Sequence, residues 1–195
     1  MDNWNNILNE DILKSNISFA ALFVLHFECL KDYIITQPKT FYSDVEIKNG
    51  KLCCEETEEY KKEVRALEKN IENASLRWFI DADAIAQEDY NLYQELRERR
   101  NDIMHELLKN LNNGFGEADA KLYIRLLELY RKIDKWWINE IEIPISGEVM
   151  PDEYDPEQVS GGQAMILSII NDIIFDNNKE RYKTLLDELK KLGIA

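Results

Sequence analysis

The chain has 195 residues, a length that suits a single domain with a core of its own. Its apolar content of 45% is ordinary for a globular protein and excludes wholesale disorder. Its formal charge of −14 opposes indiscriminate binding to polyanions, so contact with a nucleic acid requires a local basic surface on an acidic body. Glycine and proline are scarce, which favours helices.

The first predicted helix spans residues 4–35, and Pro38 is expected to stop it. Its apolar run from Ile17 to Leu30 contains His26 and Glu28 and is too short to span a bilayer. We therefore predict a central core helix without membrane association, in which His26 is a hydrogen-bonded core residue. The chain opens without the basic stretch of a signal peptide, which is consistent with a cytoplasmic protein.

Residues 41–54 carry a β-type pattern. Asn49-Gly50 lies between two β-prone arms, which is a strong short-range signal for a hairpin turn. Because an isolated hairpin is only marginally stable, we expect a small two-stranded ribbon or an ordered loop that packs on the helices.

The three cysteines do not form a disulfide framework. They are Cys29, Cys53 and Cys54, an odd number with two adjacent in sequence. We expect reduced thiols, as in the cytoplasm.

Three helical segments are predicted in the central part of the chain. The first is a charged helix over residues 56–79. The next is expected to begin at an N-cap, Asp81 or Asp83, and to end at the C-cap sequence Asn112-Asn113-Gly114. An amphipathic helix follows over residues 117–141.

The last quarter of the chain begins with an acidic, proline-containing loop over residues 144–158, and helices are predicted over residues 162–175 and 179–192. Ser160-Gly-Gly-Gln163 is similar to the signature loop of ATP-binding-cassette ATPases, but the chain has no phosphate-binding loop to accompany it. Ser160 and Gln163 are therefore interpreted as a capping box for the helix that follows.

The pattern as a whole predicts an all-α fold. Residues 1–195 form one helical domain, a bundle of five or six helices with one small β-hairpin insertion near residues 41–54.

The acidic clusters do not have the spacing of a metal site. They occur at residues 55–59, 81–83 and 152–157, and none matches an EF-hand loop. The two histidines, His26 and His105, have no Cys or His at metal-ligand spacing. We predict solvated acidic surface, no metal and no cofactor.

The most informative residue is Arg100, which occupies a position in a helix where an apolar side chain belongs. At about 100° per residue, it lies within roughly 60° of six apolar side chains. These are Tyr93, Leu96, Ile103, Met104, Leu107 and Leu111. A buried arginine is costly unless it is paired or faces a polar cavity. Glu28, which shares a helix face with Lys31, is one candidate for its counter-charge.

Arg100, Asn101 and His105 together suit cleavage of a phosphodiester by the neighbouring 2′-hydroxyl group, without a metal. The imidazole of His105 can accept a proton from that hydroxyl or return one to the leaving oxygen. The guanidinium of Arg100 can hold the phosphate, and Asn101 can orient the imidazole or donate to the phosphate. Arg97 and Arg99 add local positive charge and are candidate substrate-binding residues.

One helix does not direct both groups at the same atom, because Arg100 and His105 are about 140° apart on a straight helix. Two copies related by a two-fold axis can supply both groups to a shared groove. The chemistry therefore predicts a homodimer.

The pattern Arg100-Asn101-x-x-x-His105 near the end of a long bundle helix resembles the signature of the HEPN superfamily (higher eukaryotes and prokaryotes nucleotide-binding). The resemblance implies an α-helical, metal-independent endoribonuclease that dimerises so that Arg100 and His105 of both copies line one cleft. It also implies an RNA substrate and a toxin-like or antiviral-defence role, with an antitoxin or regulatory protein as partner. One branch of the family has a tyrosine two residues after the histidine as a target of nucleotide transfer. This chain has Leu107 there, so that regulation is not implied.

Two alternatives remain from the sequence. In a non-catalytic helical interaction module, Arg100 is a structural ion-pair residue and the acidic surface binds a basic protein partner. In a nucleotide-sensing domain, Arg100 holds a small phosphate ligand.

Overall fold

The computed structural model describes residues 4–48, 51–147, 150–151 and 153–175. Over these residues the protein is built mainly from helices, and the predicted all-α class is confirmed. Two strands, β1 (Asp44–Lys48) and β2 (Lys51–Glu55), pair antiparallel with Asp44 opposite Glu55. The predicted Asn49-Gly50 turn and the predicted helix over residues 179–192 lie outside the described residues.

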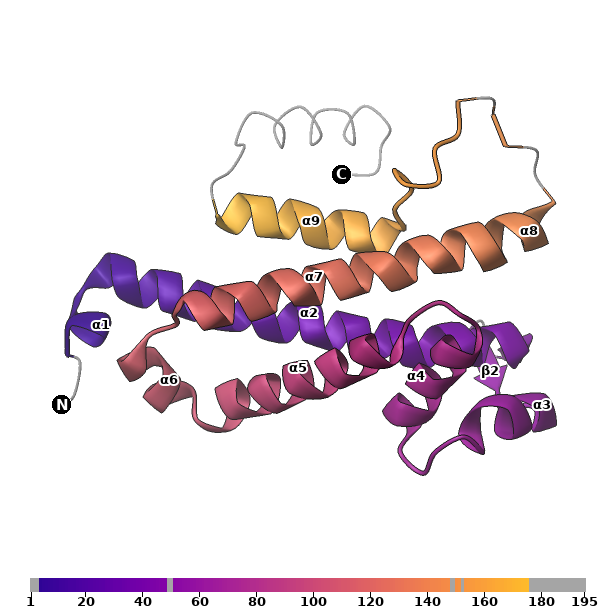
Figure 1. Cartoon of the computed structure of the whole chain (residues 1–195), viewed down its shortest axis with the longest axis horizontal. Coiled ribbons are helices and arrows are strands. Elements are labelled where there is room, and N and C mark those ends of the chain that lie inside the picture. Colours follow the sequence, from indigo (N-terminus) through magenta and orange to yellow (C-terminus); the bar gives the residue numbers. More distant parts are fainter. Residues whose placement is uncertain (1–3, 49–50, 148–149, 152, 176–195) are drawn as a thin grey trace.

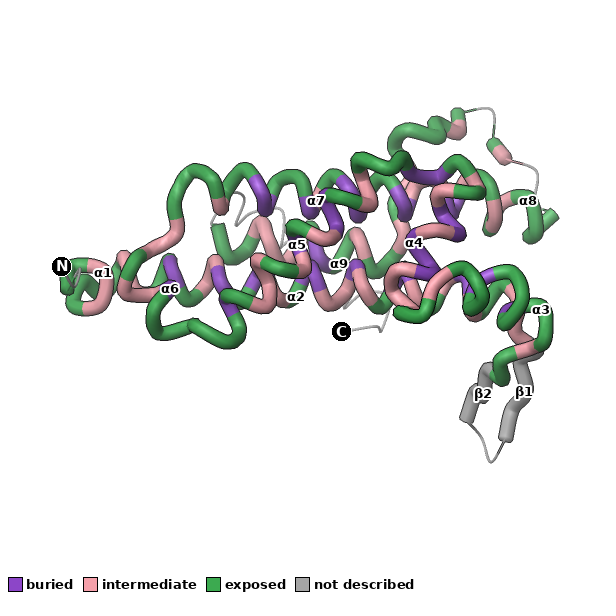
Figure 2. The backbone as a smooth tube through the Cα atoms, turned by 60° about the horizontal axis from the view of Figure 1, so that its bottom comes forward, coloured by how far each residue is buried: buried purple, intermediate pink, exposed green. Residues whose placement is uncertain are grey.

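Four helices lie along the length of the molecule (Figure 1). They are α2 (Glu10–Tyr42), α5 (Gln87–His105), α7 (Glu117–Trp137) and α9 (Gly162–Ile174). α2 is the central element, and α4, α5, α7 and α9 all contact it. The burial pattern in Figure 2 places the core between these helices, with exposed residues on the outer turns.

The described residues form more helical segments than the five or six that we predicted, because several expected helices are divided. The predicted helix over residues 4–35 is divided at Asn9 into α1 (Trp4–Leu8) and α2. Asn9 is the N-cap of α2, and its side chain accepts hydrogen bonds from the backbone N–H groups of Asp11 and Ile12, both at 3.1 Å. The Asn9 side chain thus satisfies backbone N–H groups in the first turn of α2, which have no partner within the helix.

The expected stop at Pro38 is wrong, since α2 continues through this residue to Tyr42. A proline inside a helix loses one backbone hydrogen bond. Here the lost bond is offset by packing, because Pro38 is buried and the rings of Phe41 and Tyr42 in the next turn contact Trp78.

α2 has the length and apolar content of a membrane-spanning helix. In this structure one of its faces is the centre of the bundle core, with Phe23, Phe27, Leu30 and Ile34 fully buried.

The predicted helix over residues 56–79 is three segments: α3 (Glu58–Tyr60), a π-helical turn η1 (Lys61–Arg65) and α4 (Ile71–Asp81). Asn70 caps α4 by accepting a hydrogen bond from the backbone N–H of Asn73 at 3.1 Å. An internal asparagine therefore starts a helix where the apolar spacing alone predicted continuity.

The predicted N-caps of the next helix are also wrong. Asp81 is the last residue of α4, and Asp83 lies in the following turn with a φ of 58°. α5 begins after Ala86, whose backbone N–H donates to Asp89 Oδ2 at 2.8 Å. The acidic side chain acts from inside the first turn of the helix, three residues after the cap.

α5 ends at His105, and α6 (Leu107–Asn113) follows it after a single non-helical residue, Glu106. The Asn110 side chain donates to the carbonyl oxygens of Asp102 and Glu106, at 3.2 and 3.1 Å, and so satisfies the interrupted helix end. The predicted C-cap at Gly114 is confirmed, with a φ of 76° that favours glycine.

α7 continues into a π-helical segment, η2 (Ile138–Glu142), and then α8 (Ile143–Ser146). The loop predicted from residue 144 thus begins later, because Pro144 lies in the first turn of α8, where a missing N–H costs little.

The predicted helix over residues 162–175 is confirmed as α9, but its capping box is wrong. Gly161 is the N-cap and has no side chain to act as a cap. The Gln163 side chain instead accepts a hydrogen bond from the Tyr130 hydroxyl at 2.9 Å.

Candidate functional site

Arg100 lies on the face of α5 that packs against α2. Its neighbours on this face, Leu96 and Ile103, are buried, as the helix wheel predicted. Met104 and Leu107 are exposed, because α5 ends at His105 and the chain changes direction there. Arg100 is therefore near the end of the buried stripe, and its side chain keeps 25% of its exposure.

The guanidinium of Arg100 contacts two side chains. Its Nη2 pairs with Glu28 Oε1, and its Nη1 donates to Asn101 Oδ1 at 2.9 Å. The expected counter-charge from Glu28 is therefore present. Its Nε is covered from solvent and has no hydrogen-bond acceptor among the described residues.

Glu28 is bound by two cations, since Lys31 on the next turn of α2 also pairs with it. Burial of Glu28 opposes its ionisation. The hydrogen bond from Lys31 and the charge of Arg100 outweigh that effect and hold the pKa of the carboxyl below its usual value. Glu28 is thus a carboxylate at neutral pH, held between Lys31 and Arg100.

His105 is the last residue of α5, and its ring is exposed. Within the described part of the chain, the imidazole has no hydrogen bond or ion pair. The side-chain Oδ1 of Asn101, one turn earlier, accepts a hydrogen bond from Arg100. In this structure Asn101 therefore orients the guanidinium, and the imidazole is left open to a ligand.

Arg97 and Arg99 turn toward other helices. Arg97 donates to Asn73 Oδ1 at 3.3 Å and lies 3.7 Å from Glu72 Oε2, both on α4. Arg99 donates to Asp119 Oδ1 on α7 at 2.8 Å and to Asn110 Oδ1 on α6 at 2.7 Å. Arg97 thus joins α5 to α4, and Arg99 joins it to α6 and α7, whereas Arg100 joins it to α2.

An apolar groove of about 220 Å³ lies between α2 and the end of α5. It is lined by Ile17, Ala20, Ala21, Val24, Ile103, Met104 and Leu107. Ile17, Met104 and Leu107 expose large apolar side chains in this groove. Met104 directly precedes His105 in the chain, and Leu107 follows two residues after it. Sequence reasoning missed this groove because it assigned Met104 and Leu107 to the buried stripe.

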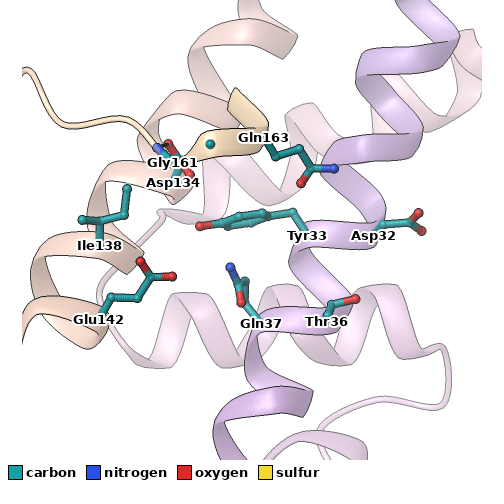
Figure 3. Close-up of a pocket in the computed structure, with 10 residues that line it drawn as sticks. Asp32, Tyr33, Thr36, Gln37, Asp134, Ile138, Glu142, Gly161 and Gln163 are labelled. Atoms are coloured by element: carbon teal, nitrogen blue, oxygen red, sulfur yellow. Dashed lines mark hydrogen bonds between the residues drawn. The ribbon is translucent and has the colours of Figure 1, made fainter. Parts of the chain in front are cut away.

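A second, polar cavity of about 400 Å³ lies between α2, the end of α7 and the start of α9 (Figure 3). Asp134 is 1% exposed and accepts the backbone N–H of Gly161 at 2.8 Å. The Tyr33 ring extends into the same space, and burial, followed by the charge of Asp134, raises the pKa of its hydroxyl above the usual range. Asp134 interrupts the apolar stripe of α7, a signal that could have marked this place in the sequence.

His26 is confirmed as a buried, hydrogen-bonded core residue. It is 2% exposed, and its Nδ1 lies 2.9 Å from the Leu22 carbonyl oxygen and 3.1 Å from the Tyr123 hydroxyl. Burial lowers its pKa, and the backbone hydrogen bonds oppose that effect only in part. His26 is therefore kept as a neutral ring inside the bundle.

No group of three or more metal-ligating side chains occurs among the described residues. Comparison with protein-family models, curated proteins and solved structures finds no match to this chain.

Proposed function

We propose that this protein is a metal-independent endoribonuclease of the HEPN type that acts as a homodimer. The observation that carries the proposal is the exposed imidazole of His105, five residues from the Arg100 guanidinium. Among the residues that the structure describes, neither the imidazole nor the Nε of Arg100 has a hydrogen-bond partner. The two groups have complementary roles in phosphodiester cleavage. An imidazole can accept and return protons, and a guanidinium binds the phosphate and stabilises developing negative charge.

In the proposed reaction the 2′-hydroxyl oxygen of a ribose attacks the adjacent phosphorus, and the bond to the 5′-oxygen of the next nucleotide breaks. His105 of one copy takes the hydroxyl proton, and His105 of the other returns a proton to the leaving oxygen. Arg100 neutralises the charge that collects on the phosphoryl oxygens. The products are a 2′,3′-cyclic phosphate and a 5′-hydroxyl.

The second copy is proposed to dock at the apolar groove between α2 and α5. Arg100 and His105 of one copy diverge along α5, so the site is incomplete in a single chain. The groove borders these residues and leaves Ile17, Met104 and Leu107 in water, although apolar surface of this kind is normally covered. A self-complementary contact here brings the two α5 ends together.

Purified protein incubated with several RNAs in EDTA tests the proposal. We expect cleavage to cyclic-phosphate ends, reduced about 10²- to 10⁴-fold in His105→Ala. Arg100→Ala should cost about 10²- to 10³-fold. Arg125→Ala, which removes an exposed arginine of α7, is the matched control and should cleave like the wild type. Intact RNA throughout would refute the nuclease, and equal cleavage by all variants would refute the site.

A second candidate function is that of a non-catalytic interaction module, in which the acidic surface binds a basic protein partner. Two observations favour it: Arg97, Arg99 and Arg100 all have partners within the chain, and the net charge is −14. In that case Arg100→Ala lowers the free energy of unfolding, and the protein neither binds nor cleaves RNA at physiological salt. We propose a cytoplasmic toxin-like or defence role only if the protein is the nuclease, and not if it is the interaction module.

A further inference from the structure

Two cations from different helices meet at one carboxylate beside the proposed nuclease site. Lys31 Nζ pairs with Oε2 of Glu28, and Arg100 Nη2 pairs with Oε1 of the same group. The side chains of Lys31 and Arg100 are 24% and 25% exposed, so the cluster reaches the surface. The sequence offered Glu28 as one candidate counter-charge and put Lys31 on the same helix face, but it did not show that both cations pair with this carboxylate.

Glu28 is the anion that lies between these two cations. A carboxylate and a phosphodiester each carry one negative charge, and each offers two oxygens to neighbouring donors. With Glu28 present, the three side chains still sum to one positive charge. The cluster is therefore a local basic spot on an acidic protein.

Glu28 contacts only one of the nitrogen atoms of the Arg100 guanidinium. The Nη2 group contacts the carboxylate, whereas the Nε–H has no acceptor among the described residues. A phosphate commonly takes two parallel N–H groups of one guanidinium. A phosphate that displaces Glu28 and uncovers this N–H group would supply the acceptor that Glu28 does not.

We propose that Lys31 and Arg100 form a phosphate-binding cradle in which Glu28 holds the place of the phosphate until the substrate displaces it. Lys31 becomes a substrate-binding residue, and Glu28 a competitor for the same cations. The inference rests on the proposed function, because it assigns the RNA phosphate to this cradle.

The exchange has a small cost for a partly exposed ion pair. Such pairs contribute little to stability, and the displaced carboxylate regains water. Charge-assisted hydrogen bonds to the phosphate are stronger than neutral ones, so the phosphate can replace the carboxylate.

The first test measures binding of an uncleavable 2′-O-methyl RNA by fluorescence anisotropy. We expect Lys31→Gln to weaken binding about tenfold and Glu28→Gln to tighten it about tenfold, as a single charge-assisted contact would. Lys14→Gln, which removes an ion-paired lysine from the same helix, is the matched control and should bind like the wild type. Weaker binding by Glu28→Gln would show that Glu28 positions Arg100, and would overturn the proposal.

The second test separates this inference from the nuclease itself, using pyrophosphate as the ligand in thermal-shift measurements. Stabilisation by pyrophosphate that increases in Glu28→Gln and disappears in Lys31→Gln and Arg100→Lys supports the cradle, even if RNA is never cleaved. Cleavage that depends on Arg100 and His105 while Lys31→Gln leaves KM unchanged would retain the nuclease and overturn the cradle.

Discussion

The two ends of the helical bundle differ in how completely they are packed. At the end formed by α4 and the last turns of α2 and α7, aromatic rings contact one another in an extended cluster. Its members are Phe41, Tyr42, Trp78, Phe79, Trp136 and Trp137. At the end formed by α1 and α6, apolar side chains remain exposed, among them Trp4, Leu8, Leu107 and Leu108.

This difference suggests that the aromatic end contributes mainly to stability and the α1/α6 end to recognition of a partner. Close-packed aromatic side chains supply much of the burial energy of a core, and the aromatic end uses them for that purpose. The α1/α6 end leaves apolar surface in water beside an open imidazole. In a folded protein such surface commonly marks an interaction site. We therefore expect substitutions at the first end to change the free energy of unfolding, and substitutions at the second to change association.

The largest expected effect is that of Phe79→Ala at the aromatic end. Phe79 is fully buried and contacts Trp78, Trp136 and Trp137, so its removal leaves a cavity. We expect the free energy of unfolding to fall by about 3–5 kcal/mol, measured by urea denaturation. Leu108→Ala at the exposed end should stay within about 0.5 kcal/mol of the wild type. A loss below about 1 kcal/mol for Phe79→Ala would contradict a close-packed aromatic end.

A smaller loss is expected from Gly161→Ala at the polar cavity. A Cβ atom at this position would lie 2.6 Å from Asp134 Oδ1, a carboxylate that is itself buried. Because that carboxylate cannot move without losing its hydrogen bond to the Gly161 N–H, we expect about 1–3 kcal/mol of destabilisation. Gly162→Ala, with open space around its Cβ, should be neutral or stabilising by up to about 1 kcal/mol. Equal stabilities of the two variants would show that Asp134 adapts.

The pH dependence of stability should follow His26. Burial lowers the pKa of His26 below its ordinary value of 6.5, so the unfolded chain binds a proton more readily than the folded one. The stability that comes from keeping the ring neutral is present above pH 6.5 and is lost as the pH falls below it. Urea midpoints measured between pH 5 and 8 should show this loss in the wild type.

A substitution at His26 assigns that pH dependence to its ring. His26→Gln should lower the overall stability but flatten its dependence on pH. A slope that survives in His26→Gln would mean that another group titrates in this range.

The sequence predicted the fold class and the elements with the strongest patterns, including α9, the C-cap at Gly114 and the buried His26. It failed where a side chain overrides the apolar spacing. Asn9 and Asn70 start helices within runs that read as continuous, because their side chains satisfy free backbone N–H groups. Pro38 was interpreted as a stop because the packing of the following turn on Trp78 is a tertiary effect.

At the candidate site, too, the sequence predicted some features and missed others. The helical wheel placed Arg100 on the buried face, and Glu28 was one candidate for its counter-charge. The wheel could not show that Lys31 shares that carboxylate or that α5 ends at His105. The Lys31–Glu28 pair lies within α2, and α5 ends at the local turn of Glu106. Only the contact of Arg100 with the same carboxylate depends on how α5 packs against α2, which is a property of the folded chain. The apolar groove was missed for the same reason.

The smallest effect on unfolding, and the sharpest test of the comparison, is expected from Leu107→Asp in the apolar groove. Leu107 is exposed and begins α6, where an acidic residue suits the helix N-terminus, so the fold should tolerate the change within about 0.5 kcal/mol. A carboxylate in a dimer contact would face its own copy across the two-fold axis, and we expect association to weaken at least about tenfold.

Sedimentation at several protein concentrations measures this effect. Ile124→Asp, which places the same charge on an exposed apolar position of α7, should leave the dimer intact. If the proposed nuclease uses both copies, RNA cleavage should fall with the dimer fraction in Leu107→Asp and recover at high protein concentration, because each chain keeps its own Arg100 and His105. A monomeric wild type, or a dimer that tolerates Leu107→Asp, would remove the groove from the interface and leave the exposed end of the bundle for another partner.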